Sequence, residues 1–112
     1  MDRVQRQGLE GYQLAYVAEG DVPVACIGFR RQERLTHGPL FYVDDLITLP
    51  RVRSNGYGAQ LLDWVEALAR EEGRRVVDLD SGTERERAHR FYFRQGYHIA
   101  GYHFVKRLEQ SP

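Results

Sequence analysis

The sequence predicts an α/β fold of the α+β kind, with a mixed, mostly antiparallel sheet and the element order β-β-β-α-β-α-β. Three observations lead to this prediction. Apolar residues alternate in strand-like runs through the first half of the chain, turn signals separate these runs, and the spacing becomes helical after residue 60. A length of 112 residues suits a single domain over residues 1–112.

The first half of the chain is expected to form three strands. Tyr12–Ala18 and Val22–Arg30 flank a turn signal at residues 19–21, so they should pair as a hairpin. Residues 31–38 are polar and are expected to form a loop. The third strand covers residues 39–49 and stops at a proline, which cannot continue a strand ladder.

The middle of the chain is expected to form a helix and a short strand. Apolar residues recur at helical spacing from Leu61 to Ala69, and Gly73 then ends the helix as a C-terminal cap would. A short apolar strand follows at residues 76–80. Because a helix joins this strand to the previous one, the two strands should be parallel.

Both ends of the chain carry further expectations. A capping box at residues 83–86 predicts the start of a second helix, which Gly96 closes. Residues 97–108 are rich in aromatic side chains and predict a final strand. The polar residues 1–11 are expected to be disordered or to form the tail of a helix.

Composition and charge exclude several classes of protein. Sixteen basic and sixteen acidic residues cancel, so the chain has no electrostatic footprint for nucleic acid or an anionic membrane. One cysteine can form neither an internal disulfide nor, with scattered histidines, a zinc site, and we expect no metal. No apolar run reaches the length of a membrane helix and the first residues are too polar for a signal peptide, so we expect a cytoplasmic protein.

A glycine-containing turn between the third strand and the first helix is the most informative segment. Glycines let backbone N–H groups approach a ligand closely, and a helix N-terminus favours an anion such as a diphosphate. A plain strand-to-helix turn is the alternative interpretation. The segment lacks the Gly-Lys-Ser/Thr ending of a P-loop, and Leu61 stands where a dinucleotide fingerprint needs a third glycine.

Two motifs in this sequence resemble one family. Arg53-Ser54-Asn55-Gly56-Tyr57-Gly58 matches the Arg/Gln-x-x-Gly-x-Gly/Ala signature of the GNAT superfamily of acetyl-CoA-dependent N-acetyltransferases. Residues 88–97, with the sequence AHRFYFRQGY, resemble the second motif of that family, Ala-x-x-x-Tyr-x-x-x-Gly-Phe. The resemblance covers the chain from about Tyr12 to its end.

The resemblance implies a GNAT-like acyltransferase fold and a role for each motif residue. The chain would move an acetyl group from acetyl-CoA to a primary amine of a small molecule or peptide by direct attack in a ternary complex. The backbone of three strand residues would hold the thioester and pantetheine arm, and the amides of the turn would hold the diphosphate. These residues are Leu46, Ile47 and Thr48 on the strand, and Arg53, Ser54, Asn55, Gly56, Tyr57 and Gly58 in the turn.

Two residues are assigned to proton transfer. The resemblance implies that the Tyr92 hydroxyl is the general acid that protonates the leaving thiolate, and a core tyrosine is the alternative. Asp44 and Asp45 are neighbours in a strand, so they are expected to face opposite sides of the sheet. We assign the general base to Asp45, with a water chain as the alternative.

The chain also departs from the family pattern. Only eleven residues precede Tyr12, where the family has another strand and two helices that form much of the acceptor pocket, so we expect that strand and those helices to be missing. Apolar residues on the last strand favour a homodimer. The alternative functions are a non-catalytic module that binds or senses acetyl-CoA or another acyl-CoA, and a nucleotide-binding domain of another kind.

Overall fold

The computed structural model of the chain describes residues 4–9 and 11–109. They belong to two compact units, the first ending at Leu79 and the second beginning at Asp80. The single domain expected over residues 1–112 stays a prediction.

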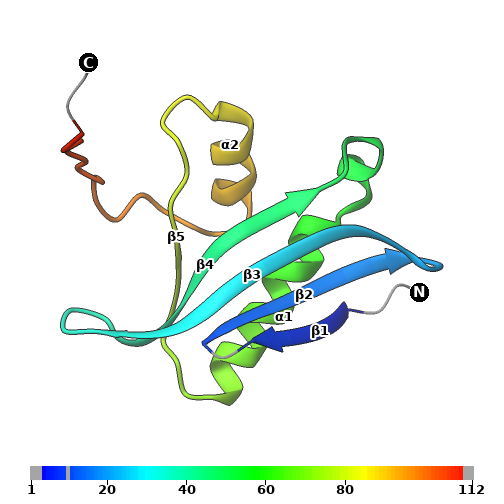
Figure 1. Cartoon of the computed structure of the whole chain (residues 1–112), viewed down its shortest axis with the longest axis horizontal. Helices are drawn as coiled ribbons and strands as arrows, with labels where there is room; N and C mark the ends of the chain where they lie inside the picture. Colours follow the sequence, from blue (N-terminus) through cyan, green and yellow to red (C-terminus); the bar gives the residue numbers. More distant parts are fainter. Residues whose placement is uncertain (1–3, 10, 110–112) are drawn as a thin grey trace. The chain divides into compact units, whose positions relative to one another are not determined.

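The first unit is built on one sheet, in which five strands follow one another in sequence order. Neighbouring strands are antiparallel from β1 to β4, and β5 is parallel to β4 (Figure 1). The mixed, mostly antiparallel sheet and its parallel crossover are therefore confirmed. The strands are β1 Val4–Leu9, β2 Tyr12–Glu19, β3 Val22–Arg34, β4 Gly38–Thr48 and β5 Val76–Leu79.

The N-terminal segment corrects one prediction. Residues 4–9 were expected to be disordered or helical, yet they form β1 and pair with β2 from Val4–Val17 through to Leu9–Tyr12. Gly11 makes this possible, because its positive φ of 78° is suited to a tight return of the chain. A strand therefore does precede the hairpin, and the expectation that the N-terminal strand is missing was wrong. Residues 1–3 and 10 of the predicted disordered or helical segment lie outside the described residues.

The second hairpin is longer than predicted. β3 continues to Arg34 and β4 begins at Gly38, so most of the expected loop over residues 31–38 is strand. The polar residues at this end are held by ion pairs rather than by apolar packing. Arg34 pairs with Asp78 on β5, and Arg31 pairs with Glu72. Composition alone therefore underestimated the length of this hairpin.

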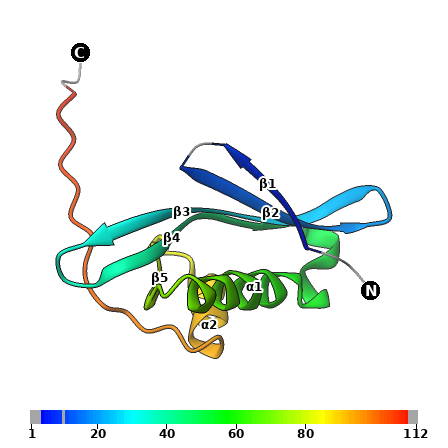
Figure 2. The same cartoon turned by 90° about the horizontal axis from the view of Figure 1, so that it is seen from below.

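Helix α1, Tyr57–Glu71, lies along one face of this sheet (Figure 2). The apolar stripe predicted from its spacing faces the sheet, and Phe29 packs edge-on against both Phe41 and Trp64. Gly73 has a positive φ of 72° directly after the helix, which confirms it as the terminating residue. The fully buried core side chains are Ala15, Val17, Ile27, Phe29, Leu40, Phe41, Leu61, Leu62 and Val65.

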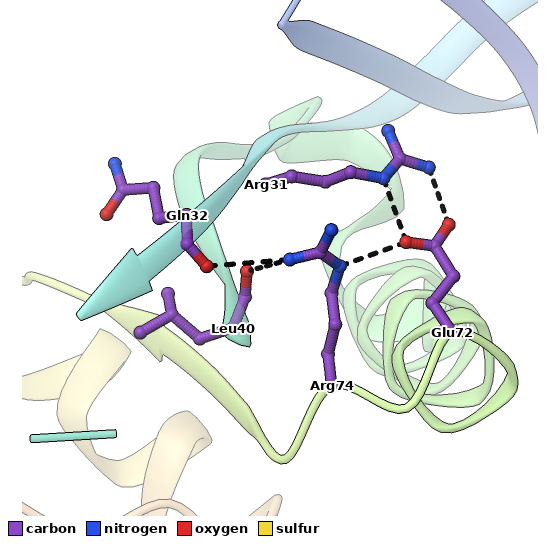
Figure 3. Close-up of polar contacts among 5 residues, drawn as sticks. All are labelled: Arg31, Gln32, Leu40, Glu72 and Arg74. Carbon is purple, nitrogen blue, oxygen red and sulfur yellow. Dashed lines mark hydrogen bonds and ion pairs between the residues drawn. The ribbon is translucent and has the colours of Figure 1, made fainter. Parts of the chain in front are cut away.

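A polar cluster joins the end of α1 to the sheet (Figure 3). Glu72 accepts hydrogen bonds from Arg31 Nε at 2.8 Å and from Arg74 Nε at 2.9 Å. Arg74 also donates from Nη1 to the Leu40 carbonyl oxygen at 3.2 Å. Both guanidinium groups lie near the Phe41 ring, at 5.6 and 5.1 Å from its centroid. The two arginines lower the pKa of Glu72 to about 2.

The second unit contains helix α2, Glu86–Arg94. The predicted capping box at residues 83–86 is wrong, because the helix begins after Arg85 and no side chain caps it. The backbone forms a tight turn there instead, with the Arg85 N–H donating to the Gly82 carbonyl oxygen at 3.1 Å.

The predicted final strand is also wrong, since residues 97–109 adopt no regular structure. Strand propensity depends largely on packing against a neighbouring strand. No strand of the described part of the chain pairs with this segment, and its apolar side chains are exposed. The exposed side chains are Ile99, Tyr102, Phe104, Val105 and Leu108.

Candidate functional site

The C-terminal half of β4 leaves one edge unpaired by β5. β5 pairs with β4 only along Leu40–Val43, whereas β4 continues to Thr48. The Leu49 N–H donates to the Val24 carbonyl oxygen on the β3 side at 2.9 Å. Because backbone groups alternate along an antiparallel ladder, Leu46 and Thr48 direct their N–H and C=O groups to the opposite edge. An extended ligand could therefore bind there as an added strand would.

A short turn connects this edge to α1. The strand ends before Pro50, as expected, and a 3-10 helix then covers Pro50–Asn55. Gly56 follows with a φ of +81°. Gln60 donates to the Gly56 carbonyl oxygen at 3.0 Å, which is the first hydrogen bond of α1. The N–H groups of residues 57–59 thus belong to the helix N-terminus, where backbone donors lack partners within the helix. This end of α1 is suited to an anion.

The turn is fastened to the end of β2. Tyr57 is buried and donates a hydrogen bond from its hydroxyl to Glu19 Oε2 at 2.6 Å. Arg51 lies 3.4 Å from the other oxygen of the same carboxylate. One acidic side chain on β2 therefore holds both the 3-10 helix and the first residue of α1.

The structure brings the predicted coenzyme residues together in one continuous feature of the first unit. Leu46 and Thr48 present backbone groups at the unpaired edge of β4, whereas the backbone of Ile47 faces β3, and residues 53–58 run from the 3-10 helix into α1. The side chains of Arg53, Ser54 and Asn55 are exposed. Arg53 stands in the last turn of the 3-10 helix, so it places a full positive charge beside the N-terminus of α1.

Asp44 and Asp45 do not face opposite sides of the sheet, which corrects the prediction. The ladder pairs Gly28 with Asp45 but Phe29 with Val43, so Asp44 is the extra residue of a β-bulge. Arg30, which binds Asp44, stands directly opposite Tyr12, whose hydroxyl binds Asp45. Both carboxylates therefore lie on the face of the sheet that α1 does not cover.

The two carboxylates have different partners. Arg30 binds Asp44 with two hydrogen bonds, from Nε at 2.9 Å and from Nη2 at 2.7 Å. Asp45 is exposed and accepts a hydrogen bond from the Tyr12 hydroxyl at 3.1 Å. Burial raises the pKa of Tyr12, and the neighbouring Asp45 carboxylate raises it further, so the hydroxyl remains a donor. Nothing in the sequence indicated the roles of Tyr12, Gly28 and Arg30. These residues meet the two acids only through strand pairing, and even the nearest contact, between Arg30 and Asp44, joins residues 14 positions apart.

Tyr92, the predicted general acid, lies in α2 of the second unit. Its ring is partly buried and contacts the rings of Phe91 and Tyr97, with centroids 5.4 and 6.1 Å away. Burial raises the pKa of Tyr92, while the positive charge of Arg85 opposes the rise. The hydroxyl is therefore protonated at neutral pH, as an acid must be.

The described residues, 4–9 and 11–109, contain no group of three or more His, Cys, Asp or Glu side chains arranged to bind a metal ion. Within the same ranges, no helix combines the length and apolar character that a membrane span requires.

Comparison with known proteins gives consistent matches. The model of the acetyltransferase (GNAT) family matches residues 2–97. The aminoalkylphosphonate N-acetyltransferase of Salmonella typhimurium is 37% identical over 98 residues, which are 87% of this chain and 62% of that protein. The uncharacterized N-acetyltransferase YhdJ of Bacillus subtilis is also 37% identical over 98 residues, covering 87% of this chain and 69% of its own. The chain thus spans less than two thirds of the length of the Salmonella relative.

Solved structures share the fold at lower identity. A transcriptional regulator from Bacillus halodurans superposes with a TM-score of 0.80 and 22% identity, over 89% of this chain and 68% of its own. The aminoglycoside N-acetyltransferase AAC(6')-Iy, solved with a CoA-containing bisubstrate analogue, gives a TM-score of 0.79 and 14% identity, over 91% and 72%. These likenesses establish the fold.

Proposed function

Because the chain belongs to the acetyltransferase (GNAT) family, we propose that it transfers an acetyl group from acetyl-CoA to a primary amine of a small molecule or peptide. The observation that carries this proposal is the unpaired edge of β4, which continues through Gly56 into the N-terminus of α1. One edge offers backbone groups to an extended pantetheine arm, and the helix end that follows offers N–H donors to a diphosphate.

The proposed reaction takes place in a ternary complex. The amine nitrogen attacks the thioester carbonyl, a C–N bond forms and the C–S bond breaks. Asp45, or a water chain, accepts the proton that the amine loses, and the Tyr92 hydroxyl protonates the departing thiolate. Burial raises the pKa of Tyr92, so the hydroxyl carries its proton at neutral pH, as this role requires, but it is a weaker acid than a free tyrosine.

The acceptor is proposed only by class. The exposed Asp45 carboxylate favours an amine that arrives as a cation, whereas Asp44 is already paired with Arg30. The Salmonella relative is named for aminoalkylphosphonates, so 2-aminoethylphosphonate is the first acceptor to test, with spermidine as a second. We propose that the chain acts in the cytoplasm, without nucleic acid, a membrane or a metal.

The proposal includes a homodimer. Tyr102 is 86% exposed and Phe104 is 91% exposed. Their segment has the composition of a strand but forms none with the described residues. A second copy of the chain would bury this surface. Sedimentation at micromolar concentration is expected to show a species larger than the 13.0 kDa monomer, and a monomer alone would contradict this part of the proposal.

The experiment that tests the function measures binding and thiol release separately. Calorimetry with acetyl-CoA is expected to show saturable binding, and addition of an amine should then release free coenzyme A thiol. Binding without thiol release from any amine would instead support the alternative, a module that binds or senses an acyl-CoA. Stabilisation by ATP but not by acetyl-CoA would contradict both and favour a nucleotide-binding domain.

A further inference from the structure

Tyr12 crosses a neighbouring strand to reach Asp45. Tyr12 is on β2 and Asp45 is on β4, so β3 lies between them. The Tyr12 hydroxyl nevertheless donates to Asp45 Oδ2 at 3.1 Å. The two residues are 33 positions apart in the sequence, and only the order of the strands brings them together.

Gly28 provides the space for this crossing. Gly28 is the β3 residue that pairs with Asp45, and a Cβ atom placed on it would lie 1.8 Å from the Tyr12 hydroxyl oxygen and 2.5 Å from Cζ. Because the backbone of Gly28 does not adopt a positive φ, conformational freedom does not explain the glycine. The Tyr12 ring itself occupies the place where a side chain would be.

The neighbouring acid is already committed to another partner. Arg30 binds both oxygens of Asp44, whereas Asp45 is exposed and bound by a single hydroxyl among the described side chains. Asp45 also directly precedes Leu46, whose backbone groups face the unpaired edge of β4. Of the two acids, Asp45 is thus the one whose carboxylate can both stay fixed and still accept a bond from a ligand.

We propose that Tyr12 is a positioning residue, which reaches over Gly28 to hold the Asp45 carboxylate on the face of the sheet that α1 does not cover, where the acceptor amine is bound. This inference rests on the proposed function. The Tyr12 hydroxyl occupies one lone pair of Asp45 Oδ2 and leaves the other oxygen for the ammonium group or for the proton of the attacking amine. Because this hydrogen bond already restricts the Asp45 side chain, less conformational entropy is lost when the carboxylate orients the amine.

The test compares Tyr12→Phe with Tyr16→Phe. Both variants remove a hydroxyl from β2, and residues 12 and 16 lie on the same face of the strand. We expect Tyr12→Phe to lower kcat/KM for 2-aminoethylphosphonate or spermidine about tenfold, with an unchanged acetyl-CoA dissociation constant, because loss of a positioning contact costs roughly this much. Tyr16→Phe is expected to leave both quantities unchanged.

A double-mutant cycle separates positioning from a structural role. If Tyr12 acts through Asp45, Tyr12→Phe should cause no further loss when Asp45 is already replaced by Asn. A structural role would lower the rate by the same factor in both backgrounds, and that result would overturn the proposal. An unchanged kcat/KM for Tyr12→Phe would overturn it as well, while acetyl transfer by the wild type would leave the proposed function intact.

Gly28→Ala tests the same contact from β3, the strand that the Tyr12 side chain crosses. The new methyl group should displace Tyr12, lower kcat/KM as Tyr12→Phe does, and lower the melting temperature. Adding Tyr12→Ala removes the clash, so the melting temperature should rise again while kcat/KM stays low. Recovery of the rate in this double variant would overturn the positioning role. A wild-type chain that binds acetyl-CoA but acetylates no amine would overturn the proposed function and this inference with it.

Discussion

The Tyr57 hydroxyl donates a hydrogen bond to the Glu19 carboxylate at 2.6 Å, and this contact ties the first residue of α1 to the last residue of β2. Tyr57 is buried, so the carboxylate satisfies a hydroxyl that could not otherwise reach water freely. Glu19 also holds Arg51 of the 3-10 helix. The proposed diphosphate site is therefore fixed to the sheet by a side chain outside the sequence motif.

Replacing Tyr57 with Phe is expected to loosen this site. The variant leaves Glu19 without its short hydrogen bond, so the free energy of unfolding should fall by about 1 kcal/mol. Acetyl-CoA binding should weaken several-fold, because the amides of α1 are held less firmly. Urea unfolding and calorimetry measure the two effects. Arg51→Gln, which removes the longer contact of Glu19, serves as the comparison and should have the smaller effect on stability.

Gly56 is expected to be required for coenzyme binding. Its φ of +81° is strained for any side chain, so Gly56→Ala should cost about 1–2 kcal/mol of stability and shift the turn before α1. Gly38 has a similar φ of +67° at the other end of β4, so Gly38→Ala is a matched control for backbone strain. Calorimetry should show weaker acetyl-CoA binding for Gly56→Ala alone. Equal affinities in the two variants would contradict the role of this turn.

Tyr92→Phe is expected to lower turnover without changing acetyl-CoA affinity. The proposed proton transfer occurs only as the thiolate leaves, so the loss should appear in kcat, by about 10²-fold, and not in binding. Tyr16→Phe, which removes a hydroxyl from β2, is again the control and should behave as the wild type. A weaker affinity with unchanged turnover would show that Tyr92 is a structural tyrosine.

Elements with a local signal were predicted well from the sequence. The alternation of β2 and β3, the helical spacing of α1 and the stop at Pro50 each depend on neighbouring residues, and each matches the structure within a few positions. The turn around Gly56 was identified for the same reason, since its positive φ demands glycine. Gly56 is therefore both a glycine of the family motif and a residue whose backbone conformation requires glycine.

Features that depend on distant partners could not be predicted. β1 forms because β2 is available to pair with it, although Gln5, Arg6 and Gln7 in its middle are polar. The bulge at Asp44 exists only in the register with Gly28 and Phe29, and it reverses the expected direction of one carboxylate. For the segment after Tyr97, a strand was predicted and none forms. Its composition is typical of a strand, but the described part of the chain offers it no partner strand.

The Glu72 cluster predicts how stability depends on pH. Its pKa is about 2 in the folded chain, below the unperturbed value of 4.5, so the folded state favours the charged form. This contribution is fully present above pH 4.5 and is lost as the pH falls towards 2. Glu72→Gln should therefore lower the free energy of unfolding at pH 7 by about 1–2 kcal/mol, after allowance for solvent screening.

The same variant should approach the stability of the wild type as the pH falls through 2, because Glu72 then becomes protonated in the folded state as well as in the unfolded state. Glu71→Gln is the matched control, an exposed neighbour that should change the stability little at any pH. Urea unfolding curves at pH 7 and at low pH give the comparison. A difference between Glu72→Gln and the wild type that stays constant with pH would mean that packing of the side chain, and not its charge between Arg31 and Arg74, stabilises this end of α1.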